Sequence, residues 1–184
     1  LTAAKTGFVQ SASGLRFQSS GGQKFYVNWR GKSVSQASSL TSKGRAALGT
    51  SFKWGGVPNL GPDYNAGFNA ALGIMATEDG TTVEIFGYNP NSTFRLGTDA
   101  DGITADALTI ALNAGQTYVL EAPFNTAGSP NTDGWLGASI TSTKNIAVNI
   151  GEMLFQTNPA SGIGQDAGMD QIIPENTLGK EYVF

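Results

Sequence analysis

Apolar and polar side chains alternate in short runs along most of this chain, and clusters of turn-forming residues separate the runs. Residues 15–18 alternate in this way and lead into a Ser-Ser-Gly-Gly segment. Residues 24–29 follow it and carry aromatic and β-branched side chains. Short alternating runs are typical of strands with one buried face, and the intervening cluster is typical of a turn. The pattern therefore predicts a first β-hairpin.

Three further pairs of runs have the same form, each interrupted by a short polar segment that contains Asp-Gly, Ala-Gly or Lys-Asn. Asp-Gly in particular favours a hairpin, because its tight turn needs a positive φ. We predict that each pair forms a hairpin. The pairs are 72–77 with 81–86, 108–112 with 116–121, and 136–142 with 146–150. Residues 75–85 and 140–150 also share a pattern, which leaves two explanations open: an internal duplication, or the general likeness of hairpins with polar turns.

Many short strands and almost no helical periodicity predict an all-β fold, an antiparallel β-sandwich of jelly-roll-like form. No linker divides residues 1–184, so a single module is expected. Two long loops, 52–69 and 122–134, are rich in Gly, Pro and Asn and carry or adjoin several large rings. Such rings either pin a loop to the body or bind a ligand, and pinning is the more common role. Trp54, Tyr64 and Trp135 are the candidate ligand-binding residues.

The composition removes most catalytic chemistry. The chain has no His and no Cys, which excludes His-dependent triads, thiol nucleophiles and His- or Cys-ligated metals. Glycoside hydrolysis needs only a pair of suitably spaced carboxylates, but no paired-acid motif stands out. The chain is therefore predicted not to be an enzyme. The candidate acids for the opposite case are Glu78, Glu84, Glu121, Asp133 and Glu152.

One loop has the residues of a calcium site. Asp99, Asp101 and Asp106 lie around a glycine, and hard oxygen ligands at alternating loop positions suit Ca²⁺. The alternative, which we favour, is an acidic turn between strands. Residues 164–171 form a second acidic loop with the same two interpretations. No other cofactor is expected.

Charge is divided unevenly along the chain. Residues 1–53 contain eight basic residues and no acid, whereas residues 54–184 contain all 14 acids and three bases, which gives the net charge of −3. Neutralisation between the two parts is the favoured interpretation, and a basic face for an acidic partner is the alternative. The spaced bases argue against nucleic acid as a partner. No run of apolar residues is long enough to cross a membrane, so no membrane insertion is expected.

Five segments, taken in order, resemble a known family: 25–31, 42–49, 75–83, 112–119 and 168–174. The set is similar to the N-terminal region of large type IX-secreted surface proteins of gliding bacteria, including gliding-motility adhesins. It also resembles the IgGFc-binding-protein N-terminal domain family. The resemblance implies export, display on the cell surface and adhesion, and it supplies no catalytic residues.

The last residues, 179–184, have the pattern of a strand that has just begun, so we expect the chain to be part of a longer protein. Together with the resemblance, this predicts a non-catalytic extracellular adhesion or structural module of a large bacterial surface protein. Its expected partners are other modules of that protein and, as a further option, a polysaccharide or cell-surface glycan. The alternative is a carbohydrate-binding or carbohydrate-processing module that uses loop aromatics and carboxylates.

Overall fold

The structure, a computed structural model, describes residues 3–11, 13–33, 36–58, 69–124, 129–155 and 166–181. All strand pairs within these residues are antiparallel, and short 3-10 helices η1 (Ala3–Lys5), η2 (Gly44–Ala47) and η3 (Glu175–Thr177) join some of them. The predicted all-β class is confirmed. The strands are β1 (Val9–Gln10), β2 (Asn28–Ser33), β3 (Gln36–Thr41), β4 (Leu48–Lys53), β5 (Asn69–Ala76), β6 (Thr81–Phe86), β7 (Phe94–Leu96), β8 (Asp99–Ile103), β9 (Ala107–Leu112), β10 (Thr117–Pro123), β11 (Ser139–Phe155) and β12 (Asp166–Gln171).

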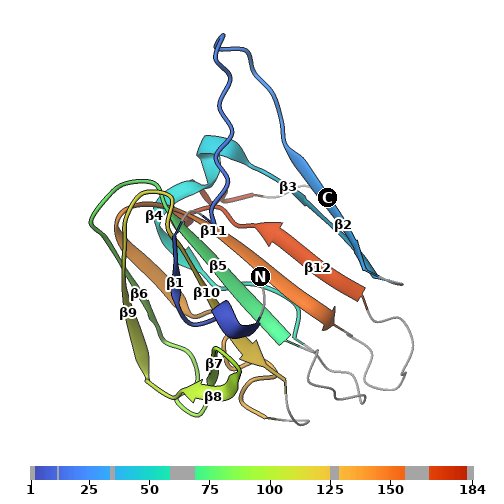
Figure 1. Cartoon of the computed structure of the whole chain (residues 1–184), viewed down its shortest axis with the longest axis vertical. Helices are drawn as coiled ribbons and strands as arrows, with labels where there is room; N and C mark the ends of the chain where they lie inside the picture. Colours follow the sequence, from blue (N-terminus) through green and yellow to red (C-terminus); the bar gives the residue numbers. More distant parts are fainter. Residues whose placement is uncertain are drawn as a thin grey trace.

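The 17-residue strand β11 organises the main sheet. This sheet has the order β1-β10-β5-β11-β6-β9, and β4 and β12 also pair with β11. The first part of β11 pairs with β6 and its later part with β5 and β12, whereas β4 pairs with both parts across a register shift. β11 therefore belongs to both layers of a sandwich, and Figure 1 shows it in orange as it bends from one layer into the other.

The three later predicted hairpins are bent ribbons instead. Strands β5 and β6 do not pair with each other; both run antiparallel to β11, from Asn69 opposite Met153 to Phe86 opposite Ser139. Strands β9 and β10 do not pair with each other either: β9 pairs with β6, and β10 pairs with β5. The hairpin prediction is wrong here because a turn with positive φ, such as that at Gly80, also suits a corner where a ribbon passes between two layers.

Hydrogen bonds join three corners, where ribbons pass between the layers: the β5–β6 corner, the bend in β11 and the β9–β10 turn. The Thr77 hydroxyl donates to the carbonyl of Asn145 at 2.6 Å, which joins the β5–β6 corner to the bend in β11. The backbone N–H of Ala114 donates to Asp79 Oδ1 at 3.0 Å, which joins the same corner to the β9–β10 turn. The polar residues of the predicted turns thus bind neighbouring ribbons rather than closing their own hairpins.

The core lies between the two layers and follows the predicted alternation. Every second residue of β5 is buried, and the same holds for the first five positions of β6. Large rings fill one end of this core: Trp54 lies 5.3 Å from Trp135 and 6.0 Å from Phe94 between ring centroids, and Tyr88 meets Phe94 edge to face. Packing of this kind stabilises a fold both by burial and by aromatic contact.

The N-terminal region differs from this body. Residues 13–27, here called the arm, contain no strand, although 15–18 and part of 24–29 are predicted as strands. The prediction of a hairpin there is wrong because pairing begins only at β2, which forms its own hairpin with β3. Figure 1 shows the arm in blue, projecting away from the sandwich. Large apolar side chains of the arm, such as Tyr26 at 83% exposure, have no core to enter.

Candidate functional site

The β2–β3 hairpin lies over the outer face of the layer formed by β5, β11 and β12, and a pocket of about 350 Å³ lies between them. The inward positions of β3 alternate with exposed ones, which places Gln36 and Ser38 on the pocket side. Trp29 on β2 is opposite Leu40, and Gly31 is opposite Ser38, so the indole and a bare stretch of backbone form one wall. Alternation therefore accounts for the pocket face of the hairpin, whereas Lys32, opposite the exposed Ala37, lines the pocket from the hairpin's edge.

The floor of the pocket has very small side chains. Ala71 on β5 is opposite Gly151 on β11, and Gly151 is opposite Met169 on β12. A Cβ added at Gly151 would meet its nearest neighbours at 3.6 Å or more, which is ordinary contact distance. The floor is therefore open because this position lacks a side chain, and not because the backbone forbids one.

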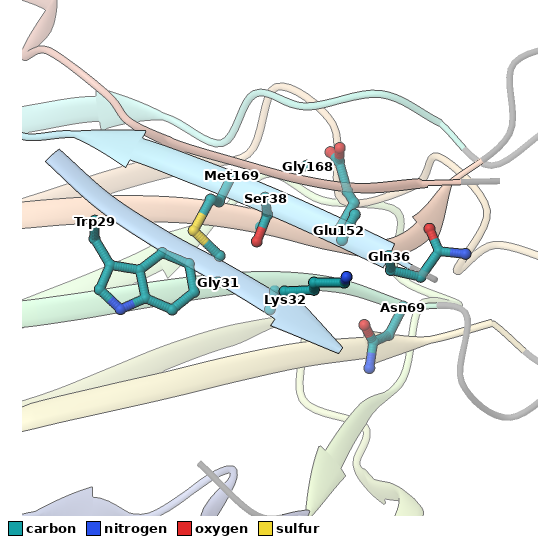
Figure 2. A pocket seen from close by; sticks show the side chains of 12 residues that line it. Trp29, Gly31, Lys32, Gln36, Ser38, Asn69, Glu152, Gly168 and Met169 are labelled. Atoms are coloured by element: carbon teal, nitrogen blue, oxygen red, sulfur yellow. The ribbon is translucent and has the colours of Figure 1, made fainter. Parts of the chain in front are cut away.

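The two ends of the pocket differ chemically (Figure 2). Trp29 and Met169 lie at one end, and the thioether points toward the indole. Lys32 extends toward the other end, where Gln36 and Asn69 also lie. The Asn69 amide donates to Glu121 at 2.8 Å, which fixes its orientation. An elongated ligand would therefore meet an apolar surface first and a cationic, hydrogen-bonding group second.

The acid on the pocket wall, Glu152, is engaged elsewhere. Its carboxylate accepts a hydrogen bond from the backbone N–H of Val57 at 2.6 Å, and it lies beside Gly56 and the Trp135 ring. Burial raises the pKa of the Glu152 carboxyl above its usual value, and the hydrogen bond from Val57 opposes part of that increase. In Figure 2 this carboxylate points away from Trp29 and Lys32. The pocket side of the hairpin is thus left with the positive charge of Lys32.

The other buried acid has a structural role. Glu121 on β10 is paired with Arg95 on β7 at 2.9 Å, with both side chains about nine-tenths buried. Glu121 also accepts hydrogen bonds from Asn69 and, at 3.4 Å, from the buried hydroxyl of Thr6. These contacts join the N-terminal segment, the β7–β8 ribbon and the main sheet. A carboxylate held in this way is saturated with donors and is a poor candidate for acid–base chemistry.

The family described as IgGFc binding protein matches residues 37–184. The chain belongs to this family. No curated protein and no solved structure matches it. Membership in the IgGFc-binding family indicates an extracellular binding or structural module. Within the described part of the chain, no helix is both long enough and apolar enough to cross a bilayer.

The IgGFc-binding family match begins at Ala37, inside β3. It therefore covers the sandwich from η2 onward and the pocket floor, but not the arm, β2 or Trp29. The pocket combines a floor from the family's shared region with a wall that lies outside the match. This division matters for function, because the wall carries both the exposed indole and Lys32.

The three aspartates proposed as calcium ligands do not form one cluster. Asp101 accepts a hydrogen bond from the Thr93 hydroxyl at 2.7 Å, and Asp99 accepts one from the backbone N–H of Asp101 at 3.1 Å. Asp106 lies near Tyr88; burial chiefly, and then the charge of Asp106, raises the pKa of Tyr88 to about 12. Among the described residues, no group of three or more acids could hold a metal ion. Asp99 and Asp101 lie on strand β8, which pairs with β7, so the expectation of an acidic turn is wrong for these two residues, and Asp106 lies in the short segment between β8 and β9.

The predicted ligand-binding rings lie elsewhere than in this pocket. Trp54 and Trp135 are each 1% exposed and pack against each other in the core, so they pin their loops and offer no surface to a ligand. Tyr64 falls outside the described residues. The ring that sequence reasoning missed is Trp29, which is 48% exposed. The signal that could have found it is the Trp-Arg-Gly-Lys run at residues 29–32, an aromatic flanked by two bases and a glycine.

Ion pairing inside the chain leaves the basic segment largely uncompensated. Of its eight bases, only Lys43 forms an ion pair within the described residues, with Asp170 at 2.7 Å. Asp170 lies in the segment 164–171 that is predicted as an acidic loop; this prediction is wrong for residues 166–171, which form strand β12, and residues 164 and 165 lie outside the described part. Internal neutralisation is the favoured interpretation of the uneven charge. Among the described residues, a direct ion pair supports it for only one of the eight bases, Lys43. Lys53 and Arg30 donate instead to neutral side chains, Ser139 at 2.7 Å and Asn28 at 2.9 Å, which leaves their charge without an acidic partner.

Proposed function

We propose that this chain is a non-catalytic adhesion or structural module of a large bacterial cell-surface protein, displayed outside the cell. The observation that carries the proposal is the arm together with β2, which presents large apolar and basic side chains and no acid. Such a surface is costly to expose unless it meets a partner, because apolar patches on soluble proteins mark interaction sites.

The distribution of exposed apolar side chains supports this assignment. Half of the large apolar residues that are exposed in the described part of the chain lie between residues 15 and 29. Bases alternate with them at Arg16, Lys24 and Arg30. A surface that mixes rings with cations can attach to proteins or to acidic glycans, by burial and by charge.

The absence of catalysis is also part of the proposal. With no His or Cys in the sequence, carboxylates are the main candidates for acid–base chemistry, and the buried Glu121 and the half-buried Glu152 are bound by donors. Carbohydrate processing is therefore the weaker alternative. Carbohydrate binding is favoured by a separate observation, the pocket that contains Trp29.

The wider setting is inferred from family and resemblance. The family's description names a protein that binds IgG Fc, which supports a protein or glycoprotein surface as one class of partner. The likeness to gliding-motility adhesins supports a place in a long surface filament, where neighbouring modules of the same protein would be further partners. Type IX secretion belongs to this same proposal.

An adhesion assay under flow tests the assignment. Beads coated with the chain should resist detachment from protein and acidic-glycan films, and replacing Phe25 and Tyr26 together by Ser should weaken the attachment. The matched control is Leu136→Ser, which removes an exposed apolar side chain from the body. Equal losses in both variants, or no attachment of the intact chain to any film, would contradict the adhesive role. Turnover of any glycan by the intact chain would contradict the non-catalytic role.

A further inference from the structure

We propose that the pocket under the β2–β3 hairpin binds a carboxylated sugar unit of an acidic polysaccharide. Trp29 is the stacking surface for a sugar ring, and Lys32 is the partner of the carboxylate. This inference rests on the proposed function, because it names one kind of surface to which the module attaches.

The charge around the pocket favours an anion. Lys32 is exposed and has no ion-pair or hydrogen-bond partner among the described residues, and Arg30 is next but one on the same strand. The nearest acid, Glu152, directs its carboxylate to the N–H of Val57 and away from the hairpin. A Lys ammonium and a carboxylate form a short, charge-assisted hydrogen bond. A neutral ligand would leave this cation uncompensated.

The indole favours a sugar ring. Trp29 is about half exposed, whereas the other two tryptophans are buried. An open indole face with an apolar floor beside it matches the C–H face of a pyranose, since both surfaces are flat and apolar. Trp29 and Lys32 are three positions apart on β2, so their side chains leave the strand on opposite faces, and Lys32 lines the pocket from the edge of the hairpin. The stacking surface and the cation are therefore separated along the pocket, as Figure 2 shows.

The size and lining of the pocket agree with such a ligand. A volume of about 350 Å³ lies at the lower end of the range for small-molecule sites. The hydroxyl of Ser38 and the side-chain amide of Asn69 line it and offer polar groups to sugar hydroxyls. Gly151 keeps the floor flat, which allows a chain of rings to pass across it. An acidic peptide would match the charge but would make no use of the flat aromatic surface.

The three tryptophans provide a direct assay. Because Trp54 and Trp135 are 1% exposed, a soluble quencher such as acrylamide reaches mainly the emission of Trp29. An oligogalacturonate hexamer should protect this emission from quenching. Its methyl-esterified form keeps the rings and loses the charge, so it should bind weaker by about tenfold or more. Calorimetry with Trp29→Ala should show the same loss without the fluorescent reporter.

Two matched pairs of variants locate the site. Lys32→Gln should weaken oligogalacturonate binding by about tenfold, whereas Arg16→Gln, the same charge change on the arm, should leave it within about twofold. Gly151→Val should block the floor of the pocket and weaken oligogalacturonate binding. Gly73→Val should leave binding unchanged, because Gly73 on β5 shares the outer face of Ala71 but does not line the pocket. A Cβ at either glycine meets ordinary contacts, so both variants are expected to fold.

Three results would overturn the proposal. Trp29 could stay fully quenchable in the presence of the hexamer, Arg16→Gln could weaken binding as much as Lys32→Gln, or poly-L-glutamate could protect Trp29 as well as the sugar. The last result would assign the pocket to an acidic polypeptide. The flow assay separates this proposal from the proposed function. Adhesion without oligogalacturonate binding rejects the pocket alone, and binding without adhesion rejects the adhesive role alone.

Discussion

The sandwich and the N-terminal arm use the same kinds of residue in opposite ways. In the sandwich, tryptophans stack in the core, the buried acids are bound by donors, and the polar corner residues tie neighbouring ribbons together. In the arm and β2, large rings and bases face solvent, and the family match does not cover them.

This contrast suggests that the sandwich serves as a rigid scaffold, whereas the arm and the β2–β3 hairpin provide a contact surface. The bent ribbons use their side chains to hold one conformation, because each corner is bound by the next. The arm and the β2–β3 hairpin leave most of their side chains exposed, and their contacts with the body include the Ser13–Thr117 hydroxyl pair and the link from Lys43 to Asp170 and Gln171. A scaffold of the first kind can carry a contact surface of the second kind without being changed by it. The following predictions test that separation.

The largest contrast is expected between two tryptophans. Trp135→Ala removes a fully buried ring that contacts Trp54 and donates to the carbonyl of Asn131, so it should lower the free energy of unfolding by about 4 kcal/mol. Trp29→Ala should lower it by less than about 1 kcal/mol, because the indole is half exposed. Urea unfolding followed by far-UV circular dichroism measures both. Similar losses would show that the hairpin is part of the core.

A second contrast compares two ion pairs. Arg95→Met leaves the Glu121 carboxylate buried without its cation and should cost about 3 kcal/mol. Lys43→Met breaks an exposed pair and should cost less than about 1 kcal/mol. If the Arg95 effect comes from the stranded charge, the double variant Arg95→Met with Glu121→Leu should recover part of the loss. No recovery would mean that the packing of Arg95 is what matters.

The body could be predicted from its alternation, but its pairing could not. The period-two alternation of apolar and polar residues predicted strands β5 and β6, their buried faces and the all-β class, and the burial in the structure follows it. The partner of each strand depends on β11, which lies more than 50 residues away, and a local turn such as Glu78-Asp79-Gly80 is the same in a hairpin and in a corner. The likeness of residues 75–85 and 140–150 falls on two ribbons that bend side by side.

The site was less accessible to sequence reasoning. Aromatic residues in the Gly- and Pro-rich loops left pinning and ligand binding open, with pinning favoured, and the structure buries Trp54 and Trp135, because a large ring gains most from the core. Trp29 looked like part of an ordinary strand. Its exposure depends on where the hairpin sits over the sheet, which no local pattern contains. The acids at 99, 101 and 106 looked like parts of one turn, but Asp99 and Asp101 lie on strand β8, and the separate contacts of the three acids follow from three-dimensional geometry.

A smaller contrast compares two glycines with positive φ. Gly80, at φ +64°, lies in the corner between β5 and β6, and Gly22, at φ +72°, lies in the arm. Gly80→Ala should lower the free energy of unfolding by about 1 kcal/mol, because a left-handed conformation strains any other residue and neighbouring corners prevent relaxation. Gly22→Ala should change it by less than about 0.5 kcal/mol, because the arm can adjust. Equal effects would mean that the arm is as firmly held as the body.

The smallest effect is expected at Glu152, which lines the pocket and accepts a hydrogen bond from the backbone N–H of Val57. Burial raises its pKa in the folded chain, so the folded state keeps a proton over a pH range in which the unfolded state has lost it. Stability therefore falls as pH rises from the ordinary glutamate pKa through the raised value. Glu152→Gln should remove this dependence and be at least as stable as the parent chain at neutral pH, because the amide oxygen can still accept from Val57. Unfolding in urea at a series of pH values measures the difference between the two chains, which should shrink as pH falls. A difference that is constant with pH would show that the carboxylate is as well solvated in the folded chain as in the unfolded one.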